Sequence, residues 1–184
     1  LGSGEAIWHT DMSYIDEPPS ASLLYALETP PTGGDTGFAN MYAAYDQLSA
    51  SMQARIADLT INHDASRDSA DGQRKGYDAV TDARDAPGAR HPAVRTHPVT
   101  GRKALFLGRR RNAWAVGLSL NESDELLDEL WAHATQPSLH WHHQWSVGDL
   151  LVWDNRSTLH RRDSFDAKAR RLLHRTQIRG DRPV

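Results

Sequence analysis

The stretch WHTDMSY, residues 8–14, places His9 two positions before Asp11. In an extended strand the side chains of residues i and i+2 point to the same face, so this spacing would present an imidazole and a carboxylate side by side. A facial triad of two histidines and one carboxylate leaves three positions of an octahedral ion open for substrate and dioxygen, as in non-haem Fe(II) oxygenases. A histidine and an aspartate fall two apart by chance in many proteins, so a metal site requires a third ligand elsewhere in the chain.

The composition restricts the ligands that any metal site could use. The 184 residues include no cysteine, so disulfides and thiolate metal sites are excluded, and His, Asp or Glu must hold any ion. Nitrogen and oxygen ligands of this kind favour Fe(II) or Mn(II) and leave Zn(II) open.

Charge and hydropathy exclude several classes of partner. The net charge of −3 provides no broad basic field, which argues against a nucleic-acid partner. No stretch approaches the roughly 18 apolar residues of a membrane span, and no signal-peptide pattern opens the chain, so we expect a cytoplasmic protein without a membrane partner. The length suits one large domain.

Strand-like segments lie at both ends of the chain and helical ones lie between them. SASLLYALETP (20–30) is rich enough in apolar residues for a core strand, and PPTGGDTGFAN (30–40) is a turn leading into a second strand. Residues 41–59 carry apolar side chains near helical period, which predicts one helix or two in succession. The polar residues 63–90, poor in large apolar groups, predict a long mobile loop that could act as a lid.

The second half continues this alternation. Residues 91–108 predict a hairpin with its turn at 98–102, and NESDELLDELWAHATQP (121–137) predicts an amphipathic helix that starts at Asn121 or Ser123. The segment 139–155, LHWHHQWSVGDLLVWDN, predicts a strand, a turn and a second strand. With no repeat and no domain boundary, the pattern favours a β-sandwich or jelly roll with inserted helices.

The far end of the chain carries a motif that gives the opening stretch a context. VWDNRSTLHRRDSFDAKARRLLHRTQIRGD (152–181) resembles the C-terminal signature of the taurine dioxygenase and 2,4-dichlorophenoxyacetate dioxygenase (TauD/TfdA) family of Fe(II)/2-oxoglutarate-dependent enzymes, and residues 30–48 are similar to the G-G-D-T segment of that family. H-T-D, G-G-D-T and W-D-N-R-S-T-L-H occur in the family's order over nearly the whole chain. The resemblance implies a mainly β fold with inserted α-helices, a cupin-like double-stranded β-helix or jelly roll.

The resemblance also implies roles for individual residues. His9, Asp11 and His160 match the iron ligands, while Arg171, 11 residues after His160, and Thr36 match the pair that binds 2-oxoglutarate. A planar guanidinium can take a carboxylate through two parallel hydrogen bonds, which suits Arg171 to this task.

Arg175, four residues after Arg171, matches the arginine that holds the acidic head of the primary substrate in taurine-type members. In a strand, positions 171, 173 and 175 share one face. The implied cofactors are Fe(II), 2-oxoglutarate and O2.

The implied reaction is hydroxylation of a small anionic substrate, with succinate and CO2 as co-products. Sulfonates, sulfate esters, aryloxyalkanoates and related carboxylates are the expected substrate classes. Because Asp11 is present, hydroxylation is favoured over the halogenation of relatives that have a small residue in place of the carboxylate.

The chain departs from the family pattern in one respect. Family members carry a sizeable portion before the H-x-D motif, whereas eight residues precede His9 here. We therefore expect residues 1–184 to form a single dioxygenase domain that lacks the N-terminal portion and any pocket residues it supplies. The sequence leaves a homo-oligomer open.

Two other function classes use the same triad. A non-catalytic cupin-like metal-binding protein would account for the fold, and a zinc hydrolase would account for the ligands, but neither explains the arginine pair.

Several conspicuous side chains have an ordinary structural interpretation. We expect the arginines of charge runs to face water and the histidines and tryptophans of LHWHHQW to pack in the core. The arginines concerned are Arg161, Arg162, Arg170 and Arg179. GRRRNAW (108–114) is expected to form a surface turn, with a basic lip that attracts an anionic substrate as the alternative. His97 and His174 are also expected to be structural, and Trp153, Asp154 and Asn155 to support the site rather than to catalyse.

Overall fold

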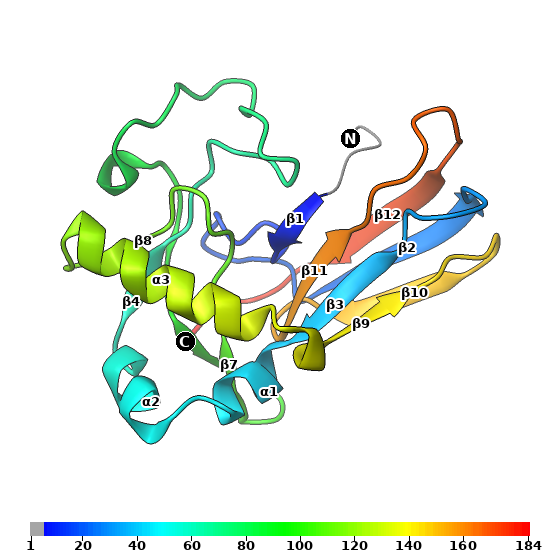
Figure 1. Cartoon of the computed structure of the whole chain (residues 1–184). Helices are drawn as coiled ribbons and strands as arrows, with labels where there is room; N and C mark the ends of the chain where they lie inside the picture. The colour runs from blue at the N-terminus through cyan, green and yellow to red at the C-terminus, as the bar shows by residue number, and fades with distance from the viewer. Residues whose placement is uncertain (1–5) are drawn as a thin grey trace.

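Two antiparallel sheets face each other in the strand-rich half of the molecule (Figure 1). The computed structural model describes residues 6–184. One sheet has the order β1 (Ala6–His9), β11 (Thr158–Arg162), β3 (Thr36–Asn40), β9 (His140–His143), and the other has the order β10 (Leu150–Asp154), β2 (Ala21–Glu28), β12 (Leu172–Ile178). Phe38 of β3 and Trp153 of β10 meet between the sheets, with ring centroids 5.3 Å apart. The mainly β, jelly-roll architecture expected from the sequence is confirmed.

The remaining elements lie on the outer side of the first sheet. They comprise α1 (Met41–Asp46), α2 (Ala50–Ile56), α3 (Leu120–Ala134), a sheet of β5 (Arg90–Pro92), β4 (Thr60–Asn62) and β8 (Trp114–Ala115), the hairpin of β6 (Val94–Thr96) and β7 (Lys103–Leu105), and two 3-10 turns at Ala83–Asp85 and Pro137–Leu139. Within residues 6–184, none of the helices combines the length and the apolar character needed to cross a bilayer.

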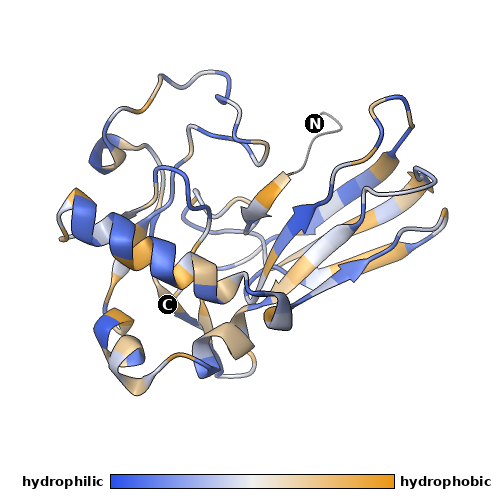
Figure 2. Cartoon of the chain, in the orientation of Figure 1, coloured by the Kyte–Doolittle hydropathy of each residue, from blue (hydrophilic) through white to orange (hydrophobic). Residues whose placement is uncertain are grey.

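Strand alternation places the apolar core and the polar interior on opposite faces of the first sheet. In β11, Leu159 is fully buried in the main apolar cluster, which also contains Met41 of α1 and Leu127 of α3. The next residue, His160, turns to the face that meets the second sheet, where its ring lies 4.9 Å from that of Trp153. Figure 2 shows the same division along α3, where hydrophilic and hydrophobic residues alternate. The helices therefore support the sheet from behind without entering the space between the sheets.

The predicted start of α3 was wrong by a few residues. The helix begins at Leu120, and Ser119 is its N-cap, because the Ser119 hydroxyl accepts from the Glu122 amide while the Glu122 carboxylate accepts from the Ser119 amide. This reciprocal pair is a capping box. Ser123, one of the predicted starts, is instead buried, and its hydroxyl accepts a hydrogen bond from the Ala115 amide.

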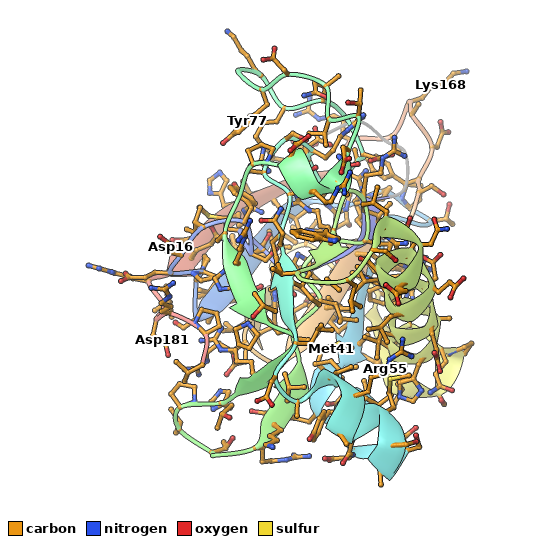
Figure 3. All side chains as sticks on the ribbon, turned by 90° about the vertical axis from the view of Figure 1, so that its left-hand side faces the viewer. Asp16, Met41, Arg55, Tyr77, Lys168 and Asp181 are labelled. Carbon is orange, nitrogen blue, oxygen red and sulfur yellow. The ribbon has the colours of Figure 1, made fainter. Side chains whose placement is uncertain are left out.

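The segment 41–59 folds as two helices in succession, which was one of the two predicted outcomes. The segment 63–90 has little regular structure, as predicted, but its first residues are not weakly packed. His63, Asp64 and Ser66 are buried, and Asp64 accepts hydrogen bonds from the Ser66 hydroxyl and the Asn112 amide group, each over 2.8 to 2.9 Å. Figure 3 shows Tyr77 at the outer end of this segment, whereas Met41 lies in the interior.

Candidate metal and co-substrate site

Strand pairing brings His9 and His160 together. The two residues are direct partners in the β1–β11 register, and their ring centroids lie 4.2 Å apart. Asp11 Oδ1 lies 3.7 Å from His9 Nε2 and 3.6 Å from His160 Nε2, and all three side chains are buried. One ligand atom from each residue falls within 4.8 Å of the others, so this triad can hold a single ion.

Asp11 reaches this position from a turn rather than from the extended strand that the sequence suggested. β1 ends at His9, and the chain turns from Asp11 onward. Asn155 fixes the turn, because its side-chain oxygen accepts from the Asp11 amide and its amide group donates to the Asp11 carbonyl, both over 3.0 Å. His9 therefore comes from the end of a strand, and Asp11 comes from the following turn, which Asn155 holds in place.

Hydrogen bonds orient the ligand atoms. His9 Nδ1 lies 2.8 Å from the Ile7 carbonyl, so the tautomer that donates there leaves Nε2 with its lone pair directed at Asp11 and His160. The Ser22 hydroxyl donates to Asp11 Oδ2 over 2.8 Å, which leaves Oδ1 facing the two imidazoles. The donor set of two imidazole nitrogens and one carboxylate oxygen suits Fe(II) or Mn(II).

The protonation states also suit metal binding. Burial, reinforced by the neighbouring His9, lowers the pKa of His160 to about 3, so its imidazole is neutral at pH 7. Burial acts to raise the pKa of Asp11, but the nearby His9, His160 and Arg175 outweigh it and hold that pKa well below its usual value. The site therefore presents a neutral imidazole at His160 and an ionised carboxylate at Asp11, the forms that bind metals.

A cavity of about 330 Å³ opens beside the triad, and His9 and His160 form part of its wall. Its wall also contains all three residues expected to bind co-substrate and substrate, namely Thr36, Arg171 and Arg175. Two larger hollows, of about 480 and 460 Å³, lie elsewhere, and no triad residue lines them. The cavity next to the triad is therefore the one relevant to chemistry.

Arg171 and Thr36 converge at one end of this cavity. Arg171 Nε donates to the Gly34 carbonyl over 2.9 Å, and its terminal nitrogen lies 3.5 Å from Thr36 Oγ1. Gly34 has a φ of +72°, and a Cβ there would lie 3.1 Å from the Arg171 side chain, so the G-G-D-T turn lets the guanidinium approach closely. Burial and the neighbouring Arg162 lower the pKa of Arg171 to about 10, so it remains a cation at pH 7.

Arg175 lies at the metal end. It projects from β12, and its terminal nitrogen is 3.3 Å from Asp11 Oδ1. Its side chain is 51% exposed, so it can move away from Asp11 without leaving a cavity in the core. Leu172 and Leu173 line the same cavity; β12 begins at Leu172 and its pairing with β2 is irregular between these two residues, so simple strand alternation does not by itself place Arg171 and Arg175 on one face.

The structure contains site residues that the sequence interpretation missed. Trp145 donates from Nε1 to Thr36 Oγ1 over 2.9 Å, and Ser22 contacts Asp11, so each fixes a residue of the site. A tryptophan in a loop and a serine in a strand carry no spacing signal by themselves. Asn155, by contrast, was expected to support the site because of its place in the W-D-N-R motif.

Three expectations about surface and core residues were wrong. Arg161 and Arg162 both line the cavity, and Arg109 of the expected surface turn 108–114 is only 7% exposed, although Arg111 in the same segment is exposed and lies in a turn. Trp141, expected in the core, is 59% exposed, although its ring stacks on Phe38 at a centroid distance of 6.2 Å. His97 is a buried structural histidine as expected, paired with Asp154 over 2.9 Å.

Comparison with known proteins agrees with this geometry. The family model for the taurine catabolism dioxygenase TauD, TfdA family matches residues 2–177. The chain is 36% identical over 187 residues to an (S)-phenoxypropionate/alpha-ketoglutarate-dioxygenase of Sphingobium herbicidovorans, covering 97% of this chain and 63% of the relative. It is 38% identical over 186 residues to an alpha-ketoglutarate-dependent 2,4-dichlorophenoxyacetate dioxygenase of Cupriavidus pinatubonensis, covering 97% and 61%.

A solved structure shares the fold. The crystal structure of AAD-2 in complex with Mn(II) and N-oxalylglycine matches with a TM-score of 0.84 and 37% identity, covering 97% of this chain and 70% of that one. The chain spans about three-fifths of the length of the two curated relatives. With a family match over nearly all of its residues, this chain belongs to the TauD/TfdA family.

Proposed function

We propose that residues 1–184 form a single domain of an Fe(II)- and 2-oxoglutarate-dependent dioxygenase that hydroxylates a small organic anion, with succinate and CO2 as co-products. The observation that carries the proposal is the shared cavity, in which His9 and His160 lie at one end and the Thr36–Arg171 pair at the other. His9, Asp11 and His160 would hold the iron, which supplies the oxidative chemistry together with 2-oxoglutarate and O2.

The chain's own contribution is to bind and orient. Arg171 and Thr36 would fix the far carboxylate of 2-oxoglutarate, since a guanidinium beside a hydroxyl offers several donors to one anion. Leu24, Trp153 and Leu173 line the cavity and would exclude water from it. Neither a metal-binding protein without activity nor a zinc hydrolase needs a half-buried arginine in the same cavity as the triad.

Arg175 would bind the anionic head of the primary substrate next to the metal. Its half-exposed guanidinium lies at the metal end of the cavity, so it would hold the substrate beside the triad. The names of the two relatives point to aryloxyalkanoates as the first substrates to test. Sulfonates and sulfate esters remain in the same test because their anionic heads would meet the same guanidinium.

The test is substrate-stimulated succinate formation. The protein, loaded with Fe(II) under anaerobic conditions, is mixed with 2-oxoglutarate and oxygenated buffer, and succinate and O2 uptake are measured with 2,4-dichlorophenoxyacetate, both enantiomers of a 2-aryloxypropionate, taurine, an alkyl sulfonate and an alkyl sulfate. We expect at least one of these anions to stimulate both signals. Hydrolysis by the Zn(II)-loaded protein without O2 uptake would instead support the zinc hydrolase.

A further inference from the structure

A row of aromatic rings crosses the first sheet from the metal ligands to the edge of the sheet. His160 of β11 is the direct partner of Phe38 in β3, and Phe38 is the direct partner of Trp141 in β9, so the three side chains share one face. The Phe38 ring stacks on both neighbours, with centroids 6.3 Å from His160 and 6.2 Å from Trp141 and an interplanar angle of 25° in each case. Because β9 ends the strand order of this sheet, the row leads outward from the triad (Figure 1).

Trp153 of the second sheet packs on the inner end of this row. Its ring centroid lies 4.9 Å from that of His160 and 5.3 Å from that of Phe38, and the residue also lines the cavity beside the triad. Its indole N–H is buried and has no hydrogen-bond partner among the described residues, although a buried tryptophan usually has one. The inner end of the row is therefore an indole in contact with a metal ligand and without an acceptor for its proton.

The two tryptophans differ in their access to water. Trp153 is 7% exposed and Trp141 is 59% exposed. An indole ring is among the easiest side chains to oxidise by one electron, whereas a phenyl ring resists oxidation and serves only as a bridge between neighbouring rings. An oxidised Trp153 would keep its N–H proton for want of an acceptor, whereas an oxidised Trp141 can release its proton to water. An electron vacancy created at Trp153 is therefore stabilised by moving through Phe38 to Trp141, where a dissolved reductant can reach it.

We propose that Trp153, Phe38 and Trp141 form an electron relay that returns the metal site to its reduced state when 2-oxoglutarate is consumed without primary substrate. The inference rests on the proposed function, which supplies the oxidising equivalents. Such a cycle balances as 2-oxoglutarate, O2, two electrons and two protons giving succinate, CO2 and water. For each electron, Trp153 reduces the metal site, Trp141 refills Trp153 through Phe38 and loses its N–H proton, and a one-electron reductant of the ascorbate class returns an electron and a proton to Trp141.

The experiment detects the radical and the site of oxidative damage. The Fe(II)-loaded protein, made with ring-deuterated tryptophan, is mixed with 2-oxoglutarate and O2 in the absence of primary substrate and freeze-quenched for electron paramagnetic resonance, and peptide mass spectrometry locates oxidised residues after prolonged turnover with and without ascorbate. Trp141→Phe keeps a ring beside Phe38 that resists oxidation, and Trp141→Tyr restores an oxidisable ring. Trp114→Phe is the matched control, because Trp114 lies in β8 outside the row, where its indole donates to the Leu118 carbonyl over 3.1 Å.

We expect the wild type to form a tryptophan radical that ascorbate removes, with oxidative damage concentrated at Trp141 when ascorbate is omitted. Trp141→Phe should lose this signal and, with ascorbate present, become inactive after fewer cycles without substrate. Trp141→Tyr should give a tyrosyl signal and recover the protection by ascorbate, and Trp114→Phe should match the wild type. An unchanged initial rate of 2-oxoglutarate consumption in each variant shows that the protein is folded and the metal site is intact.

Failure of the relay is distinguishable from failure of the proposed function. The relay is wrong, and the proposed function stands, if the wild type consumes 2-oxoglutarate without forming a tryptophan radical or if Trp141→Phe keeps both the radical and the protection by ascorbate. Damage at Trp8, which directly precedes His9 in β1, in place of Trp141 would also overturn the relay, because the vacancy would then leave the metal site by another route. If the wild type consumes no 2-oxoglutarate with or without the candidate anions, the proposed function fails and the inference fails with it.

Discussion

Each residue of the triad supplies one ligand, so the site should fail when any one is removed. We expect alanine at His9, Asp11 or His160 to abolish substrate-dependent succinate formation and to weaken Mn(II) binding, because two ligands no longer fix the coordination geometry. Calorimetric titration with Mn(II) measures the binding directly. His174→Ala is the control, since this histidine is exposed on β12 and should leave binding unchanged. Full activity of Asp11→Ala without added carboxylate would show that the triad is misassigned.

Arg171 and Arg175 lie in one cavity but should affect different ligands. Arg171→Lys keeps the charge and loses the planar fork, so we expect the apparent affinity for 2-oxoglutarate to fall by roughly 10- to 100-fold, the equivalent of about 1.5 to 3 kcal/mol. Arg175→Ala should leave that affinity nearly intact, raise KM for the primary substrate and raise the share of 2-oxoglutarate consumed without product, because a loosely held substrate is poorly aligned. Steady-state kinetics with each ligand varied in turn separate the two. Equal damage to 2-oxoglutarate binding by both variants would contradict this division of roles.

At the scale of elements, the segment 63–90 is joined to the site by a few contacts. The Ile7 amide donates to the Ser69 carbonyl over 2.9 Å, Arg109 donates to the Arg67 carbonyl over 2.7 Å, and Ser69 lines the cavity. We predict that this segment is a lid, so trypsin should cut after the exposed Lys75 more slowly when Mn(II), N-oxalylglycine and substrate are bound. Mass spectrometry of the fragments measures the rate of cleavage after Lys75, and the Lys75→Gln variant identifies the fragments that arise from this cut because it does not produce them. Equal cleavage in the free and bound protein would exclude a ligand-dependent lid.

Sequence patterns predicted those helices and strands that are determined by residues close together in the chain. The strand 21–28, the paired helices of 41–59 and the helical segment after residue 119 all follow from local periodicity and capping. β4 (Thr60–Asn62) was missed, because three residues show no period and are held by pairing with β5 and β8. Asp11 was expected in a strand and lies in a turn, because the decisive contact comes from Asn155, 144 positions away.

The candidate site was also predicted only in part from the sequence. The triad, Thr36, Arg171 and Arg175 were predicted from the family resemblance of the motifs, and the structure places all of them around one cavity except Asp11, which lies beside the two histidines that line it. Arg162 was expected to face water as part of a charge run. Its orientation depends on the strand register that places it opposite Thr36, and sequence spacing alone does not reveal that register.

Some histidines are buried in the folded protein in surroundings that disfavour their protonated form. His63 is fully buried against the rings of His91 and Phe106, with centroid distances of 5.1 and 5.3 Å, and neither of its ring nitrogens has a hydrogen-bond partner among the described residues. Burial, together with the charges of His91 and Arg109, holds the pKa of His63 well below its ordinary value. His160 is depressed in the same way, to a pKa of about 3.

These shifts fix the direction in which pH changes stability. Below about pH 6.5 the unfolded chain protonates these histidines while the folded protein keeps them neutral, so the unfolded state binds more protons. The free energy of unfolding is therefore greatest above that pH and falls as the pH drops toward the folded-state pKa of each group. Each such histidine lowers the free energy of unfolding by up to about 1.4 kcal/mol for each pH unit of acidification, and the decrease is steepest below pH 6.

A substitution at His63 tests how much of this dependence comes from this buried histidine rather than from the metal ligands. In His63→Leu the buried, unpartnered nitrogens are replaced by methyl groups of similar bulk, so we expect little change in the free energy of unfolding at pH 7.5 and a shallower decrease between pH 6 and pH 5. Urea unfolding of the metal-free protein in EDTA, followed by circular dichroism at each pH, measures both quantities. His174→Leu removes an exposed histidine and should keep the wild-type slope. If His63→Leu also keeps that slope, the pH dependence arises at other groups, with His160 the first to examine, because its depressed pKa links acid destabilisation of the fold to proton competition at the metal site.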